Sequence, residues 1–128
     1  MTQITKNFSV AEMKCKCGCD RCDMDEVFME KLQLLRDKVG PLKVSSAFRC
    51  PAHNQAESSS GPNGPHTTGK AVDVVCSGEK ARQVHGEAYI LGFKGLGVSQ
   101  KGNHASRFIH IDDVDTQDDR PRPWEWSY

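Results

Sequence analysis

Three residues of types that bind divalent cations stand inside or just before two short apolar runs. Asp73 interrupts the valines of AVDVV, and His110 interrupts the isoleucines of FIHID. A carboxylate among buried β-branched residues is costly to desolvate unless a cation or hydrogen bonds compensate it. His66 lies seven residues before Asp73, across a turn at Gly69. Two histidines and one aspartate form a zinc ligand set that leaves a fourth position for water, as catalytic sites do.

The two residues within the apolar runs also have an ordinary structural explanation. A histidine in a strand is more often a hydrogen-bonded core residue, and a buried aspartate more often caps a backbone group or pairs with an arginine. Residue types and spacing alone therefore leave a metal site and two satisfied core residues as alternatives.

Three short motifs together give the chain a family resemblance. HTTGKAVD, residues 66–73, matches H-x-x-G-x-A-x-D, SAFR, residues 46–49, matches S-x-x-R, and FIHID follows later. With these motifs the sequence resembles the zinc D-alanyl-D-alanine carboxypeptidase family within the lysostaphin, D-Ala-D-Ala peptidase and hedgehog group, particularly its small phage-type peptidoglycan peptidases. The similarity extends from about Asn7 to the RPRPW segment, residues 120–124.

The resemblance assigns roles to five residues. It implies that His66, Asp73 and His110 bind a catalytic zinc ion, which polarises the scissile carbonyl and lowers the pKa of its water. Arg49 matches the arginine that steadies the substrate carbonyl as it becomes an oxyanion, a role suited to a permanently charged side chain. Ser46 matches the motif serine and is expected to hold Arg49 or the substrate.

The general base is less clear, because the chain departs from the family pattern. Many members carry Glu or Asp three residues before the last histidine, where this chain has Arg107, and Gly64 replaces the usual serine two residues before the first ligand. Two candidates remain, Asp112 on the strand face of the last ligand and His104 in the loop before it. We predict that Asp112 orients a ligand and that His104 takes the proton.

The cysteines suggest a second metal site. The segment CKCGCDRC, residues 15–22, is a candidate structural zinc site, although its spacing is tighter than that of usual zinc fingers. Its four thiols are Cys15, Cys17, Cys19 and Cys22. Disulfides within the segment are the alternative. Cys50 and Cys76 follow two predicted strands and are interpreted either as a disulfide or as two core thiols.

The elements that must position these residues can be read from periodicity and turn signals. Two amphipathic helices and three strands are predicted, the helices within residues 23–41 and 77–93 and the strands within residues 42–48, 71–75 and 107–113. The segments 56–65 and 94–103 are rich in glycine, proline or serine and are predicted to connect them. Strands and helices mix without a βαβ repeat. The sequence therefore predicts an α+β fold with a small, mainly antiparallel sheet, flanking helices and the zinc site on the sheet face.

Length and charge set the remaining bounds. The chain has 128 residues, and its 17 basic and 17 acidic side chains cancel, so no electrostatic reason favours nucleic acid as a partner. We expect one zinc peptidase domain over residues 1–128, with the Cys-rich segment at 15–22, acting as a monomer. No apolar run approaches membrane-spanning length, and the first residues lack the features of a secretory signal. We therefore expect synthesis in the cytoplasm and no membrane insertion.

The expected function is hydrolysis of D-amino-acid-containing peptide bonds of peptidoglycan by a zinc-dependent metallopeptidase. Its partners are the stem or cross-link peptides of a bacterial wall, reached after release from the cell or as part of a phage particle. Carboxypeptidase and endopeptidase activity both stay open, as does the host wall. The main alternative is a catalytically inactive, zinc-stabilised module that binds wall peptides, and a redox or metal-handling protein built on the Cys-rich segment is a third.

Overall fold

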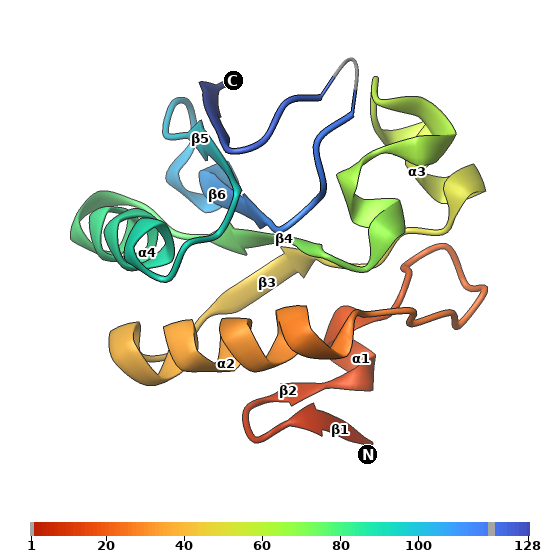
Figure 1. Cartoon of the computed structure of the whole chain (residues 1–128), viewed down its shortest axis with the longest axis horizontal. Coiled ribbons are helices and arrows are strands. Elements are labelled where there is room, and N and C mark those ends of the chain that lie inside the picture. The colour runs from red at the N-terminus through yellow and green to blue at the C-terminus, as the bar shows by residue number, and fades with distance from the viewer. Residues whose placement is uncertain (1, 118–119) are drawn as a thin grey trace.

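The structure is a computed structural model that describes residues 2–117 and 120–128 (Figure 1). The elements follow in chain order: β1 Gln3–Thr5, β2 Phe8–Ser9, α1 Val10–Met13, α2 Glu26–Val39, β3 Lys43–Ser46, α3 Pro51–Glu57, η1 Gly61–Asn63, η2 Pro65–Thr68, β4 Ala71–Val75, α4 Gly78–Ile90, β5 Gly95–Ser99, η3 His104–Ser106, β6 Phe108–Asp112 and β7 Trp124–Ser127. Two of the described helices, α2 and α4, correspond to the two predicted from periodicity.

Within the described residues, five strands form the main sheet in the order β3-β4-β6-β5-β7. All neighbours in it are antiparallel except β5 and β7, which pair in parallel. The short strands β1 and β2 form a separate antiparallel pair near the N-terminus. The predicted α+β class with a mainly antiparallel sheet is confirmed.

One face of the sheet is covered by α2 and α4, whose buried residues share one core with those of the strands and which also contact each other. Alternate residues of the central strands point into this core, as the two-residue period of a strand requires. The buried apolar residues that meet there are Phe28, Met29, Leu32 and Leu35 of α2, Ala81, Val84 and Ala88 of α4, and Val72, Val74, Leu96, Ile109 and Ile111 of the strands. The residues between these positions, including Asp73 and His110, consequently face the opposite side.

The helix α2 begins and ends where the sequence predicts. Asp25 precedes it and accepts a hydrogen bond from the backbone N–H of Phe28. Gly40 follows it with a φ of 86°, a conformation that favours glycine at a helix end. No helix within the described ranges is both long and apolar enough to cross a lipid bilayer.

The sheet is larger than the sequence predicts, because part of the glycine-rich connection forms β5 and the last described segment forms β7. Gly95 and Gly97 lie opposite Asp112 and His110 in the register of β5 and β6. A Cβ atom at Gly95 would lie 2.2 Å from the Asp112 carboxylate, and one at Gly97 would lie 2.7 Å from the Trp126 ring. The glycines therefore make room for side chains on the polar face, a use of glycine in strands that resembles a loop signal in sequence.

Candidate metal centre

Strand register brings two of the predicted ligands together. Asp73 of β4 lies directly opposite His110 of β6 in the antiparallel pairing, so both side chains leave the sheet on the same face. The His110 Nδ1 atom lies 2.9 Å from Asp73 Oδ1. Two residues 37 positions apart are thus adjacent because their strands are neighbours.

His66 reaches the same place through the turn that precedes β4. It lies in η2, which ends at Gly69 in the left-handed conformation, with a φ of 74°. A Cβ atom at Gly69 would lie 1.9 Å from the backbone oxygen of Asp23, so this turn requires glycine for its packing as well as its backbone angle. The buried His66 ring then places Nε2 3.3 Å from Asp73 Oδ1.

The second nitrogen of each histidine has its own partner. The Nδ1–H of His66 donates to the backbone carbonyl of Ala47 at 2.7 Å, and the Nε2–H of His110 donates to Asp112 Oδ2 at 2.7 Å. In the neutral rings these bonds leave His66 Nε2 and His110 Nδ1 as lone-pair atoms that both face the Asp73 carboxylate. Such outer hydrogen bonds orient metal-binding histidines in proteins.

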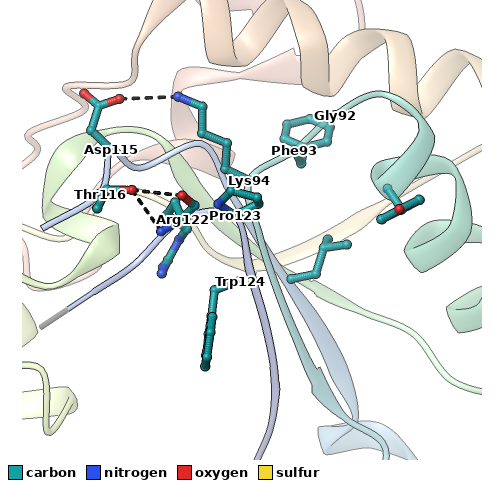
Figure 2. A pocket seen from close by; sticks show the side chains of 10 residues that line it. Gly92, Phe93, Lys94, Asp115, Thr116, Arg122, Pro123 and Trp124 are labelled. Carbon is teal, nitrogen blue, oxygen red and sulfur yellow. Dashed lines mark hydrogen bonds and ion pairs between the residues drawn. The ribbon is translucent and has the colours of Figure 1, made fainter.

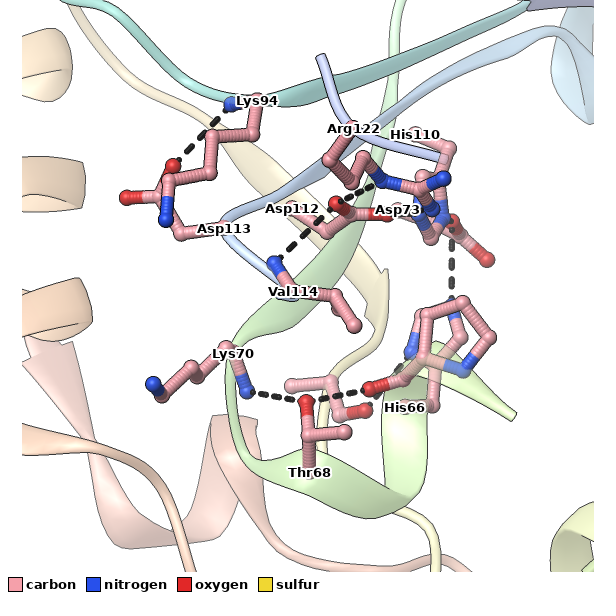
Figure 3. Close-up of polar contacts among 12 residues, drawn as sticks. His66, Thr68, Lys70, Asp73, Lys94, His110, Asp112, Asp113, Val114 and Arg122 are labelled. Carbon is pink, nitrogen blue, oxygen red and sulfur yellow. Dashed lines mark hydrogen bonds and ion pairs between the residues drawn. The ribbon is translucent and has the colours of Figure 1, made fainter. Parts of the chain in front are cut away.

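The three facing atoms form a set that a cation fits. Ligand atoms of His66, Asp73 and His110 all lie within 4.8 Å of one another, and Figure 3 shows the two histidines on either side of the aspartate. Three electron-pair donors that face one another repel unless a proton or a metal ion lies among them. Two imidazoles and a carboxylate suit zinc in number and kind. We call these three residues the sheet centre.

The pKa values of His110 and Asp73 shift strongly, and in both residues hydrogen bonds and opposite charges outweigh the effect of burial. Burial alone would lower the pKa of His110, but its hydrogen bonds to Asp112 and Asp73 raise that pKa to about 9. Burial would raise the pKa of Asp73, yet hydrogen bonds from His110 and His66 hold it well below its usual range. In the metal-free chain a proton on His110 therefore supplies the positive charge between the two carboxylates.

Asp112 lies behind His110, on the side away from Asp73. Its side chain is fully buried and accepts two hydrogen bonds from Arg122, from Nε to Oδ1 and from Nη2 to Oδ2, each 2.9 Å long (Figure 3). Burial would raise the pKa of Asp112, but hydrogen bonds from His110 and Arg122 lower it to about 2. The geometry suits the ligand-orienting role predicted for Asp112. The sequence analysis did not identify Arg122.

A cavity of about 360 Å³ opens beside the sheet centre and includes all three of its residues in its lining. Arg49 also lines it, with Nη2 3.8 Å from Asp73 Oδ2 and Nη1 donating to Asn54 at 3.1 Å. The exposed Glu57, at the end of α3, supplies a second carboxylate to the same lining. Sequence reasoning missed Glu57 because it treated residues 56–65 as a connection and did not predict α3.

Aromatic side chains form another part of the cavity lining. Trp126 of β7 places its ring centroid 5.2 Å from that of His110, and Tyr128 lies 5.2 Å from the Phe108 ring. All three aromatic residues line the cavity. The side chains therefore combine a polar centre with an apolar wall, as ligand pockets generally do.

Two predicted residues are not part of this lining. Ser46 ends β3 opposite Asp73 in register, but it is not among the residues that line the cavity. His104 is exposed in η3 and is not among them either. Arg49 therefore lines the cavity beside the sheet centre, whereas Ser46 is next to Asp73 in the sheet without lining the cavity. The roles predicted for Ser46 and His104 stay predictions.

The thiol cluster differs from the predicted one by one residue. Cys15, Cys17 and Cys19 do gather, but the fourth thiol is Cys50 rather than Cys22. Cys22 packs against the main apolar core instead. All six cysteines are free, and Cys76 belongs to the main core, so a Cys50–Cys76 disulfide is not formed. We call the group of Cys15, Cys17, Cys19 and Cys50 the thiol centre.

A second cavity, of about 580 Å³, lies near the start of β5 and β7 (Figure 2). Its polar side chains are engaged with one another, Lys94 with Asp115 at 3.3 Å and the Thr116 hydroxyl with the Arg122 backbone. None of its described lining residues is a histidine or a cysteine. This cavity offers no donor set comparable to the sheet centre.

The comparison with known families agrees with the geometry. A family model described as Peptidase M15 matches residues 6–112, a range that includes the three residues of the sheet centre and all four of the thiol centre. No curated protein matches the sequence at a significant level.

Proposed function

The chain belongs to the Peptidase M15 family, the zinc D-alanyl-D-alanine carboxypeptidase-type enzymes, and on this premise we propose that it hydrolyses D-amino-acid-containing peptide bonds of peptidoglycan. The observation that carries the proposal is the convergence of His66, Asp73 and His110 beside a cavity that also contains Arg49. Three ligands with an adjacent cavity suit a reactive metal site better than a purely structural one.

The residues in and around the cavity have different roles in the proposed reaction. Zinc held by the sheet centre would polarise the scissile carbonyl and acidify a water molecule. Arg49, held by Asn54, supports the oxygen of the substrate carbonyl as negative charge develops on it. Glu57 is the carboxylate we propose to take the proton of the attacking water and return it to the leaving amine. Asp112 and Arg122 keep the His110 ring in position.

The apolar wall supports a peptide substrate over a purely ionic one. Trp126, Tyr128 and Phe108 offer aromatic surface next to the sheet centre, against which small aliphatic side chains such as those of alanine residues can pack. We place the reaction at the bacterial wall, reached after release from the cell or on a phage particle, and we expect the protein to act as a monomer.

An inactive peptide-binding module is the second candidate function. Arg107 favours this candidate, because it occupies the position where many family members carry an acid. Its guanidinium donates to the Gly102 carbonyl of its own loop. The two candidates differ in one respect only, namely whether a group in the cavity accepts the proton of water.

Digestion of defined wall peptides tests the proposal. The purified protein is incubated with muropeptides of known cross-link type, with and without a chelator, and the products are identified by mass spectrometry. We expect cleavage next to a D-amino acid that stops on chelation and returns with added zinc. Tight binding of the peptides by the zinc-loaded protein without any cleavage between pH 6 and 9 would support the binding module instead.

A further inference from the structure

The four thiols of the thiol centre are spaced for a metal ion and not for disulfides. The Sγ atom of Cys17 lies 3.4 Å from that of Cys15 and 3.7 Å from that of Cys50, and ligand atoms of all four cysteines lie within 4.8 Å of one another. A disulfide needs about 2.05 Å between sulfur atoms. Four sulfurs at about 2.3 Å from a tetrahedral zinc ion lie about 3.8 Å apart, which is close to the observed separations.

The loop after α1 folds so that three of its thiols meet. The backbone N–H of Cys15 donates to the Arg21 carbonyl at 2.8 Å and closes the loop at its base. Gly18 has a φ of 97° and Asp20 a φ of 61°, two left-handed residues that turn the chain on either side of Cys19. In an extended segment, cysteines two residues apart would share a side but lie about 6.6 Å from each other. The turns bring Cys19 within reach of the other two thiols.

The fourth thiol comes from a different part of the chain. Cys50 precedes α3, 35 positions after Cys15, and its backbone N–H donates to Cys15 Sγ at 3.3 Å. Cys15, Cys50 and Phe48 form a small buried cluster of their own, while Cys17 and Cys19 are exposed above it. Figure 1 shows the loop after α1 close to the start of α3. A backbone N–H that points at sulfur stabilises negative charge on it, as a metal-binding thiolate requires.

We infer that Cys15, Cys17, Cys19 and Cys50 bind one zinc ion as a closed, structural site. Four sulfur ligands complete the usual tetrahedral coordination of zinc and leave no position for a substrate. Soft sulfur ligands also distinguish this site from the nitrogen and oxygen ligands of the sheet centre. Each chain then binds two zinc ions of different kinds.

The position of Cys50 links the thiol centre to the cavity. Arg49, its neighbour in sequence, lines the cavity, and the Arg49 backbone N–H donates to the His66 carbonyl at 3.1 Å. Ala47 accepts the hydrogen bond from the His66 ring. Zinc at the thiol centre would therefore fix one end of residues 47–50, the segment that orients His66 and presents Arg49. This consequence for activity rests on the proposed function, whereas the metal site itself does not.

Metal analysis of matched variants tests the inference. Wild-type protein should contain about two zinc ions per chain, His66→Ala/Asp73→Ala about one, and Cys50→Ser about one. Cys22→Ser and Cys76→Ser are the controls, because neither thiol belongs to the centre, and both should keep two ions. Cys19→Ser repeats the test at an exposed position, where loss of the ion cannot be attributed to disturbed packing.

Cobalt substitution identifies the ligands without reference to activity. Cobalt bound to thiolates absorbs strongly in the near ultraviolet through sulfur-to-metal charge transfer. We expect this absorption in the wild type and in His66→Ala/Asp73→Ala, and its loss or marked weakening in Cys19→Ser and Cys50→Ser. Absorption and metal content unchanged in both cysteine variants would overturn the inference, as would a loss of cobalt absorption in Cys22→Ser equal to that in Cys50→Ser.

The proposed peptidase function and the proposed thiol-bound zinc ion can be disproved independently of each other. Protein that carries cobalt at the thiol centre but cleaves no wall peptide would disprove the proposed function and leave this site intact. Protein that cleaves wall peptides with a single zinc ion per chain, and with no thiolate absorption after cobalt substitution, would disprove this site and leave the function intact.

Discussion

The sheet centre and the thiol centre hold their donor atoms in different ways. Asp73 and His110 are opposite each other in paired strands, so the register of the sheet sets their separation. The thiols depend on a short loop with two left-handed residues and on one cysteine from a distant segment. The first set has three donors beside a cavity, and the second has four. A rigid sheet supports the open position that chemistry needs, whereas a closed site holds a loop in place.

The largest effect is expected for a substitution that disrupts the sheet centre and leaves the thiol centre unchanged. Asp73→Ala removes the central carboxylate of the sheet centre, so peptidase turnover should fall by at least about 1,000-fold, because metal activation supplies several kcal/mol of transition-state stabilisation. Turnover on wall peptides and metal content per chain measure this. The thiolate absorption of the cobalt form should not change, and its loss would show that the centres are not independent.

The second prediction concerns proton transfer in the cavity. Glu57→Gln should keep both metal ions but lower turnover by about 100-fold to 10,000-fold, the usual contribution of a general base. The matched variant is His104→Ala, which should leave turnover unchanged because His104 does not line the cavity. The opposite pattern, with the large loss in His104→Ala, would assign proton transfer to His104, the base predicted from sequence.

Arg49→Ala should have a somewhat smaller effect. Loss of a group that supports a developing oxyanion costs about 3 kcal/mol, or on the order of 100-fold in turnover. Arg49→Lys should recover little, because a lysine cannot reproduce the planar, two-sided donation of a guanidinium. Zinc content stays at the wild-type value in both variants, and metal loss in Arg49→Ala would assign the residue a structural role.

Asp112→Asn tests the support behind the sheet centre. A partner that orients a metal-binding histidine contributes about 10-fold to 100-fold in metal affinity, so zinc at the sheet centre should be lost at correspondingly lower chelator concentration. Asp113→Asn is the neighbouring control, because Asp113 pairs with Lys31 and not with a ligand. Equal weakening in both variants would indicate a general loss of stability.

The smallest expected effect is a pH dependence of the metal-free protein. The pKa of His110 rises to about 9 in the folded chain, above its ordinary value of about 6.5. Its contribution to folding is therefore complete below pH 6.5 and is lost as the pH rises through 9. We expect thermal unfolding of the chelated protein to show a loss of about 1 to 3 kcal/mol over this interval. A melting temperature that does not fall between pH 6.5 and 9 would contradict the charge assigned to His110.

Sequence alone predicts the central parts of this molecule well. The helices α2 and α4 and the strands β4 and β6 have clear periodicity, and the predicted ligands are brought together because they lie on these strands and on the turn before β4. A strand with one polar residue among β-branched neighbours carries its own signal. The polar residue must face away from the core and must find a partner there.

The missed features share a different physical origin. β5 contains two glycines at positions where a side chain would collide with Asp112 or Trp126. These collisions are visible only in the folded structure. Cys50 completes the thiol centre across 35 positions of sequence, and Arg122 reaches Asp112 from the last loop. Each depends on which segments become neighbours in the fold. Local pattern carries no information on that, so proximity in sequence favoured Cys22 over Cys50 as the fourth thiol.

β7, which pairs in parallel with β5, contributes to the cavity lining without carrying a metal ligand, so recombination or design can change it separately. β7 brings Trp126 to the cavity from beyond residue 112, where the family match ends. The ligands and two of the three aromatic side chains, Trp126 and Tyr128, therefore lie on separate stretches of chain. Recombination or design that exchanges the last segment would alter which peptides fit and leave the ligand-bearing strands untouched. Such a graft has to retain Arg122, because its loss would remove the guanidinium and two hydrogen bonds that stabilise the buried Asp112 carboxylate.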